Sequence, residues 1–297
     1  MTSTTTAPVQ SPVSGSSAPE AVVDAVAPPA RGRPNGVRLD TIARTFDTPQ
    51  GRHEVLRDLD LELGSGEIVA VVGPSGCGKS TLLRLIAGLD QPSTGVIRIG
   101  GTALTGTDPR TAVAFQEPRL LPWRTLAQNV ALGLPLKVGR RPGRERVQEL
   151  LALVGLEHAA ELRPREVSGG MAQRASLARA LARGPEVLLL DEPFGALDAL
   201  TRLRMQDLLL EIHAAEPTTV LVVTHDVEEA LYLADRVLLL RSLREDPVSG
   251  SLARTVEVPG ARPRDRADHA LAALRVELLE GLGVHAHPTP TPSENLS

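Results

Sequence analysis

The stretch "GPSGCGKST" at residues 73–81 has the residue types and the spacing of a loop that holds phosphate. It fits the pattern G-x-x-x-x-G-K-[ST], follows the apolar run "EIVAVV" and opens the helix pattern "TLLRLIAGL". In such a loop the glycines turn backbone N–H groups toward phosphate oxygens, the lysine neutralises the β and γ phosphates, and the serine hydroxyl binds Mg²⁺. Ser80 is therefore a predicted magnesium ligand, and the predicted nucleotide-binding residues are Gly73, Pro74, Ser75, Gly76, Cys77, Gly78, Lys79, Ser80 and Thr81.

Two adjacent acids end a second apolar run, "VLLLDEP" at residues 187–193. Asp191, at the end of a buried strand, can hold Mg²⁺ through its water shell, and Glu192 can polarise a water in line with the terminal phosphate. Adjacent acids at a strand end are often only part of a turn. A fully apolar strand that ends in two carboxylates within the same core favours the catalytic interpretation.

A second candidate anion site lies in "VSGGMAQRASLARALAR" at residues 167–183. Here a serine and two glycines lead into an alanine-rich helix pattern, and the N-terminus of a helix favours an anion. The sequence thus presents two phosphate sites far apart in one chain, and the need for the second has to be explained.

The elements that must position these residues follow from hydrophobic periodicity. Apolar residues alternate from Val37 to Leu63, which is typical of half-buried antiparallel strands. Between about 125 and 183 the periodicity becomes helical. Continuous aliphatic runs are typical of a parallel sheet covered on both faces, which binds ligands beyond its carboxyl ends. The predicted fold class is therefore α/β, a P-loop NTPase core (mainly parallel sheet) with an N-terminal antiparallel β layer and an inserted α-helical subdomain. The aliphatic runs are residues 68–72, 187–190, 220–223 and 237–240.

Composition excludes several classes of protein. The 297 residues carry a net charge of −4, which is too balanced for a typical nucleic-acid-binding protein. No run approaches the roughly 18 apolar residues that a membrane-spanning helix needs, and no secretory signal is expected at the N-terminus. The only cysteine, Cys77, cannot form an intrachain disulfide, so a cytoplasmic protein fits best. Because Cys77 precedes a helix, whose N-terminal end is positive, the sequence predicts a reactive thiolate that Mg-ATP protects.

The order of "GPSGCGKST", "FQEP", "VSGGM", "LLLDEPFGALD" and "VTHD" resembles the ATP-binding cassette (ABC) family of transport ATPases over residues 37–241. The resemblance implies that Gln116 senses Mg²⁺ and the attacking water, and that His225 hydrogen-bonds the γ-phosphate; with Glu192 these form the predicted catalytic set. It further implies that Asp198 lies at a dimer interface and that Phe46 stacks on adenine. Taken singly, a histidine at a strand end is more often structural and Phe46 could be ordinary core.

The resemblance also accounts for the second anion site. In this family the signature motif binds the γ-phosphate held by the P-loop of another subunit, so Ser168, Gly169 and Gly170 are implied to cap ATP across a head-to-tail dimer of two copies. Val167 stands where the family more often has leucine, and Met171 where it has glutamine. Because the serine and the backbone amides carry the anion chemistry, we expect function to persist.

Residues 1–36 are rich in Thr, Ser, Ala and Pro and predict a disordered N-terminal arm, and the tail at 287–297 has the same character. Between them we expect an ABC ATPase domain (37–260), with its helical subdomain at about 120–183, and a short helical C-terminal extension (261–286). The family is known by its resemblance, and this resemblance implies ATP and Mg²⁺ as cofactors. The implied partners are a second copy, two transmembrane permease subunits and, through the permease, an extracytoplasmic solute-binding protein, with no nucleic acid. The implied location is peripheral, on the cytoplasmic face of the cell (inner) membrane.

The segments at residues 115–134 and 224–240 resemble the nitrate, taurine and sulfonate importer branch, and those at 198–213 and 262–284 favour aliphatic sulfonates as cargo. Trp123 follows the Gln116 segment, where family members receive a coupling helix of the permease; core packing is the alternative. The expected function is ATP hydrolysis that energises a bacterial importer.

Other ABC classes fit less well. An exporter subunit usually carries its own membrane helices, and a maltose-type importer ATPase would need a longer region after Arg241 than the chain shows. A soluble non-transport ABC ATPase of the chromosome or repair type would insert a long coiled coil between Lys79 and Ser168, and no sustained heptads occur there. Translation-associated members carry two cassettes, and a regulatory GTPase would carry an N-K-x-D motif, which is absent.

Overall fold

In the computed structural model, a six-stranded and a four-stranded sheet form the framework of the chain. The predicted N-terminal arm, residues 1–36, lies outside the described residues except at its two ends, and the predicted tail, 287–297, lies wholly outside them. No helix in the described residues has the length and apolar character needed to cross a membrane. The structure describes residues 1–3, 35–49, 51–246 and 248–284.

The six-stranded sheet provides the edge on which the candidate site is built. Its strands are parallel except for the antiparallel pair β9–β10, and their order is β10-β9-β3-β8-β7-β6. All five residues of β3 and of β8 are buried. The four predicted aliphatic runs are β3, β7, β8 and β9, so the prediction of a mainly parallel core is confirmed. The strands are β3 (Ile68–Val72), β6 (Thr111–Ala114), β7 (Val187–Asp191), β8 (Thr219–Val223), β9 (Arg236–Leu240) and β10 (Leu252–Glu257).

The four-stranded sheet is antiparallel, in the order β2-β1-β4-β5. Its first two strands are the alternating segment found in the sequence. The other two come after the phosphate loop and its helix, so the layer draws on more of the chain than the N-terminal pattern indicated. The strands are β1 (Val37–Thr48), β2 (Gly51–Leu63), β4 (Thr94–Ile99) and β5 (Thr102–Ala103).

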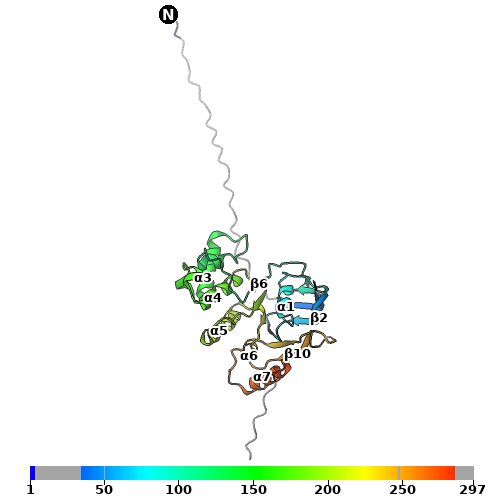
Figure 1. Ribbon diagram of the computed structural model, residues 1–297. Helices are drawn as coiled ribbons and strands as arrows, with labels where there is room; N and C mark the ends of the chain where they lie inside the picture. Colours follow the sequence, from blue (N-terminus) through cyan, green and yellow to red (C-terminus); the bar gives the residue numbers. More distant parts are fainter. Residues whose placement is uncertain (4–34, 50, 247, 285–297) are drawn as a thin grey trace, which may run out of the picture.

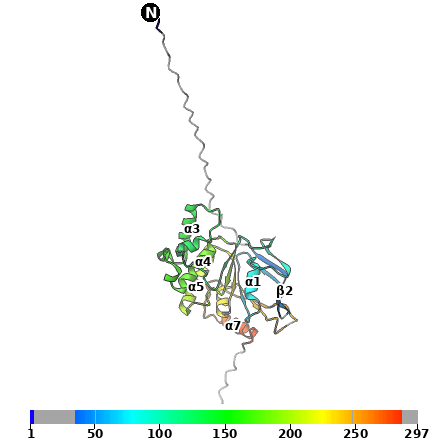
Figure 2. The same cartoon turned by 45° about the horizontal axis from the view of Figure 1, so that its top comes forward.

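Helices cover the parallel sheet on the side away from the antiparallel strands. In Figure 1 the green helices α3 and α4 lie to one side of β6, while α1 and β2 lie to the other, and Figure 2 shows the same arrangement from a turned view. Helices α2 to α4 come between β6 and β7 in the chain, where the helical subdomain is predicted. The helices are α1 (Lys79–Ile86), α2 (Leu126–Ala131), α3 (Arg140–Leu153), α4 (Gly169–Leu181), α5 (Ala199–Ala215), α6 (Val227–Leu233) and α7 (His269–Gly281), with 3-10 turns at Glu157–Ala159 and Pro164–Glu166.

Strand β3 separates two hydrophobic cores. Val69 and Val71 face the core that is shared with α1 and the antiparallel sheet. Ile68, Ala70 and Val72 face the core on the side of the helical subdomain. Successive side chains of a strand point to opposite faces, so a strand between two cores must be apolar at every position. The phosphate loop that follows β3 is thus anchored at the centre of the molecule.

Among the described residues, one carboxylic acid is buried, beside the core on the side of the helical subdomain. Glu229, on α6, is 3% exposed, and its Oε2 accepts a hydrogen bond from Gln206 Nε2 at 3.3 Å. Burial raises the pKa of Glu229 to about 7, and hydrogen bonds from Thr224 and Gln206 offset only part of this rise. A buried ionised carboxylate is costly, so the acid keeps its proton in the folded state at pH values well above its ordinary pKa and loses it around pH 7.

We predict that Glu229 makes the free energy of unfolding fall as pH rises. Its folded pKa of about 7 exceeds the ordinary value of 4.5, so the contribution is fully present below pH 4.5 and is lost as pH rises through 7. Relative to Glu229→Gln, the wild type should lose about 2 kcal/mol between pH 5 and pH 8. Urea unfolding at several pH values measures this difference.

The control is Glu228→Gln, which changes the neighbouring, exposed glutamate. It should leave the pH profile of unfolding as in the wild type. Parallel profiles for the wild type and Glu229→Gln would contradict the prediction.

Candidate nucleotide-binding and catalytic site

The predicted catalytic and phosphate-binding segments meet at the carboxyl edge of four neighbouring strands. The phosphate loop follows β3, His225 follows β8, Asp191 ends β7, and Gln116 follows β6. Because carboxyl ends of parallel strands share one edge, residues more than a hundred positions apart come together there.

Lys79 lies folded against its own loop. Its Nζ donates hydrogen bonds to the carbonyl oxygens of Gly73, at 2.7 Å, and Pro74, at 3.1 Å. The loop itself is tightly packed, because a Cβ on Gly73 would come within 2.6 Å of Cys77 Sγ and 2.7 Å of the Leu240 carbonyl oxygen. Only glycine fits at that position. The lysine head group thus lies beside the carbonyl oxygens of the predicted phosphate loop.

The Cys77 side chain lies in the hydrophobic core under the loop and is 1% exposed. Burial raises the pKa of the Cys77 thiol, and the nearby Lys79 charge lowers it by less. The prediction of a reactive thiolate is therefore wrong. The helix N-terminus favours an anion, but desolvation of this inward-pointing side chain outweighs that effect.

Ser80 and Asp191 form the candidate magnesium site. Ser80 Oγ donates a hydrogen bond to Asp191 Oδ1 at 3.2 Å, which joins the start of α1 to the end of β7. Burial raises the pKa of Asp191, with the Glu192 charge adding to it, while the Ser80 hydrogen bond and the Lys79 charge lower it. A divalent cation would relieve this unfavourable charge. The hydroxyl and carboxylate oxygens are the hard ligands that Mg²⁺ prefers.

Gln116 and His225 converge on one oxygen of Glu192. Gln116 Nε2 donates to Glu192 Oε2 at 3.0 Å, and His225 Nδ1 lies 3.4 Å from the same oxygen. Glu192 has a φ of 44°, in the left-handed region, and its backbone N–H donates to the Val223 carbonyl oxygen at 2.8 Å. Such a conformation costs free energy and persists only where the surroundings fix it. The backbone holds this carboxylate where the neighbouring strands can reach it.

The signature segment caps α4. Ser168 is the N-cap, and its Oγ accepts a hydrogen bond from the Met171 N–H at 3.3 Å. Ser168 and Gly169 are exposed, and Gly170 is half-buried. Figure 1 shows α4, which Ser168 opens, and α1, which follows the phosphate loop, on opposite sides of β6.

Asp198 lies beside the signature segment. It caps α5 by accepting a hydrogen bond from the Thr201 N–H at 3.0 Å. Hydrogen bonds from the side chain of Thr201 and then from its backbone lower the pKa of the Asp198 carboxyl. A Cβ on Gly170 would come within 2.8 Å of Thr201 Cγ2, so the starts of α4 and α5 are in contact. Asp198, Ser168 and Gly169 together form an exposed surface at two helix N-termini.

For two aromatic residues, Phe46 and Trp123, the sequence left packing in the core as an alternative to contact with a ligand or partner. Phe46 is half-buried in β1 under the Arg44 guanidinium, 4.2 Å from the ring centroid, and it belongs to neither hydrophobic core. Trp123 is 66% exposed, so the core-packing alternative for this residue is wrong. Phe46 stays a predicted adenine contact, and Trp123 is free to touch a partner.

Sequence analysis missed Arg202, which links two predicted site segments. Its guanidinium donates to the Leu197 carbonyl oxygen at 3.3 Å and lies 3.4 Å from Asp226 Oδ2. Leu197 precedes Asp198, and Asp226 follows His225. The only signal in the sequence is an arginine one turn into the helix that Asp198 caps.

The fold and this edge together define a P-loop ATPase, and comparison with known proteins gives the family. The family model described as ABC transporter matches residues 56–195. The aliphatic sulfonates import ATP-binding protein SsuB 2 of Burkholderia lata is 52% identical over 230 residues, 77% of this chain and 81% of that protein. The corresponding SsuB 1 of Rhodococcus jostii is 54% identical over 228 residues, 77% and 87% of the two chains.

A solved structure agrees with this assignment. The dimeric, post-hydrolysis ATP-binding cassette MJ0796 bound to ADP and Pi has a TM-score of 0.67 and 31% identity, and the match covers 76% of this chain and 100% of that chain. The chain belongs to the ABC transporter family, as one of its ATP-binding and ATP-hydrolysing subunits.

We predict that Cys77 is protected from thiol reagents in the folded protein with or without nucleotide. N-ethylmaleimide should label native protein at least about tenfold more slowly than urea-denatured protein, because thiolate and access are both lacking. A mass-spectrometric time course at constant pH measures both rates. Equal rates would show that the thiol is accessible in the native loop.

Proposed function

We propose that this chain is the ATP-hydrolysing subunit of an importer for aliphatic sulfonates. The observation that carries the proposal is the identity of 50–54% to several ATP-binding proteins of aliphatic sulfonate import. One of these, from Streptomyces avermitilis, matches over 250 residues, 84% of this chain and 87% of that protein. The ATPase itself need not touch the cargo, so the site geometry supports the reaction and the relatives support the substrate.

Each site residue takes a role that its geometry allows. Lys79 would exchange its loop carbonyls for the β and γ phosphates, and Ser80 and Asp191 would hold Mg²⁺, which neutralises phosphate charge when bound. Glu192 is the general base that accepts a proton from the attacking water. Gln116 and His225, both beside Glu192 Oε2, would orient that water and the γ-phosphate.

The functional unit is proposed to be a head-to-tail dimer. Within one chain, α4, which Ser168 caps, and α1, which follows the phosphate loop, lie on opposite sides of β6, which supports capping of a phosphate in another subunit. Exposed Ser168, Gly169 and Asp198 would face the partner's nucleotide, and the backbone amides of Gly169 and Gly170 would bind its γ-phosphate. Phe46 would stack on the adenine of the chain's own ATP.

A groove of about 250 Å³ offers a docking site for the permease. It is lined by Leu89 after α1, Phe115 beside Gln116, Gly133 after α2 and Arg179 on α4. Leu89 is 47% exposed. Trp123 lies, like Phe115, on the connection between β6 and α2, and it is 66% exposed. We propose that a cytoplasmic helix of one permease subunit docks in this groove, so that the two copies of the dimer receive the two permease subunits. The protein would then lie peripherally at the cytoplasmic face, and a solute-binding protein would act through the permease.

Nitrate is the second candidate cargo. The nitrate import ATP-binding protein NrtC of Synechocystis is 45% identical over 236 residues, but the match covers only 35% of that longer protein. The sulfonate relatives are matched over most of their length, which favours sulfonate. Taurine belongs to the same branch by resemblance.

We predict that deletion of the gene abolishes growth on alkanesulfonates as sole sulfur source and leaves growth on sulfate intact. Wild-type protein should restore growth, and Glu192→Gln should not, because it lacks the general base. Growth curves on sulfate, alkanesulfonates, taurine and nitrate measure the outcome. Normal growth on alkanesulfonates with failure on taurine or nitrate would reject aliphatic sulfonates as the cargo, while the proposal of an importer would stand.

The composite site is tested with purified protein. Glu192→Gln should bind ATP without hydrolysing it, so a dimer should accumulate with ATP and a monomer should remain with ADP, as light scattering would show. Adding Ser168→Arg should abolish the dimer, because a bulky side chain would occupy the phosphate position. ATP should still bind to the intact phosphate loop. A double variant that dimerises with ATP would disprove capping by Ser168 in trans.

A further inference from the structure

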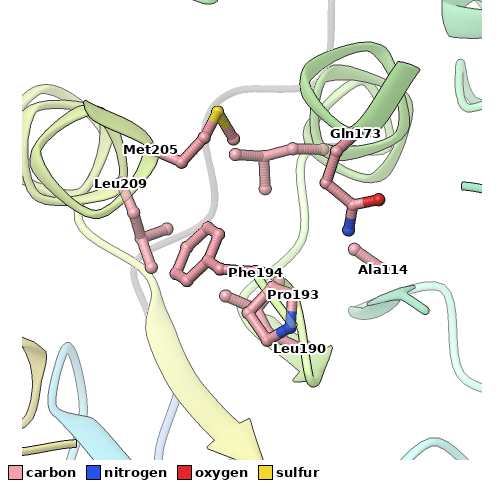
Figure 3. A pocket seen from close by; sticks show the side chains of 8 residues that line it. Ala114, Gln173, Leu190, Pro193, Phe194, Met205 and Leu209 are labelled. Carbon is pink, nitrogen blue, oxygen red and sulfur yellow. The ribbon is translucent and has the colours of Figure 1, made fainter. Parts of the chain in front are cut away.

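Helix α4 holds the segment around Gln116 from one end. Gln173, in the second turn of α4, donates a hydrogen bond from Nε2 to the Phe115 carbonyl oxygen at 3.3 Å. It is 5% exposed, and Figure 3 shows its amide nitrogen turned toward Ala114, the last residue of β6. Most of the side chains that line the same pocket are apolar, among them Phe194 and Met205. A buried hydrogen bond in such surroundings is costly to break.

The same helix holds the other end of this segment. The Arg179 guanidinium donates to the carbonyl oxygens of Pro118, at 2.7 Å, and Arg119, at 2.9 Å. Burial lowers the pKa of Arg179, which shows that the surroundings disfavour its charge. The two short hydrogen bonds compensate for that burial.

The held segment is itself strained. Arg119 has a φ of 46°, in the left-handed region, and its guanidinium lies 4.4 Å from the centroid of the Phe115 ring. Non-glycine residues keep such a conformation only where neighbours fix it. Arg179 bonds to the strained residue directly, and Gln173 bonds to the residue that carries the stacked ring. Between these two attachments lies Gln116, whose amide reaches Glu192.

We propose that Gln173 and Arg179 are positioning residues that couple the signature motif to Gln116. The proposal rests on the composite dimer of the proposed function. Helix α4 begins directly after Ser168, and a helix of 13 residues moves as one rod. When Ser168 binds the partner's nucleotide, α4 moves as a unit and the Gln116 segment moves with it. The placement of Gln116 against Glu192 then depends on occupancy of the opposing half-site.

Arg174 provides a matched control on the same helix. It also donates to two backbone carbonyls, those of Val154 at 2.8 Å and Gly155 at 3.3 Å, and burial also lowers its pKa. Its partners follow α3, within the helical subdomain, and not the Gln116 segment. Arg174→Met therefore removes comparable hydrogen bonds from α4 without touching the proposed coupling.

The first test is steady-state ATP hydrolysis by the full chain. Gln173→Met and Arg179→Met should each lower kcat at least about tenfold with KM for ATP within about twofold, since the phosphate loop is untouched. Arg179→Lys, which keeps a donor, should restore part of kcat. Arg174→Met should stay within about twofold of the wild type. Thermal melts identify any variant that fails to fold, and Gln173→Met and Arg179→Lys then carry the test.

The second test uses the fluorescence of the single tryptophan, Trp123, which follows the held segment. In the Glu192→Gln protein, ATP should produce the dimer and shift Trp123 emission together. Adding Gln173→Met and Arg179→Met should keep the dimer and remove the emission shift, and adding Arg174→Met should keep both. A purely structural role would not separate these two signals.

The outcomes distinguish the two proposals. Failure of Glu192→Gln to dimerise with ATP would reject the composite dimer and the coupling with it. Dimerisation with wild-type kcat in Gln173→Met and in the Arg179 variants would overturn the coupling alone. An ATP-induced shift of Trp123 emission that survives when Gln173→Met and Arg179→Met are added to Glu192→Gln would also overturn the coupling.

Discussion

The shared carboxyl edge of four parallel strands is the constraint on which the site depends. A loop after β3 can meet residues after β8, β7 and β6 only because these strands are neighbours in that order. These strands bring three side chains together at Glu192 Oε2. Gln116 follows β6 and His225 follows β8, the two strands that flank β7, and both side chains lie close to this oxygen. The left-handed backbone of Glu192 brings its carboxylate within reach of both. Any change in the register of β6 or β8 would therefore act on this carboxylate.

The same sheet explains why one chain carries two anion sites. The phosphate loop is anchored by β3 between two cores, whereas Ser168 opens a helix of the inserted subdomain on the far side of β6. The proposed head-to-tail dimer would bring the two together, because the exposed signature segment of one copy could meet the phosphate loop of the other. In the proposed coupling, α4 would link the two half-sites.

The sequence predicted the elements whose physics is local. Every residue of β3 is apolar because it lies between two cores, and that pattern is visible without a structure. The phosphate loop is equally local, since its glycines, lysine and serine are contiguous. By contrast, β4 and β5 join the antiparallel sheet through long-range pairing with β1, which no short window of sequence reveals. Gln116 and His225 were found through resemblance alone, because their meeting point exists only in the folded sheet.

Two failures have distinct physical causes. Cys77 was predicted to be a thiolate from its place before a helix, but the direction of its side chain, into the core, decides its pKa. Gln173 and Arg179 were missed because their hydrogen bonds end on backbone carbonyls, which leave no trace in residue types. An alanine-rich helix with an occasional polar residue has the composition of a solvated helix. In the structure Gln173 is buried and Arg179 is half-buried, and both bond to the backbone beside Gln116, which is what sets α4 apart from a solvated helix.

Several polar side chains of the site bond to one another or to the phosphate loop. Lys79 bonds to two loop carbonyls, Ser80 to Asp191, and Glu192 to Gln116. Hydrogen bonds that involve a charged group contribute about 1.5–3 kcal/mol each, so in the proposed reaction ATP and Mg²⁺ would have to replace these bonds. Nucleotide binding would then begin as an exchange of partners. Under the proposed coupling, release of Gln116 from Glu192 would also depend on α4 of the same chain, whose Ser168 end would face the partner's nucleotide.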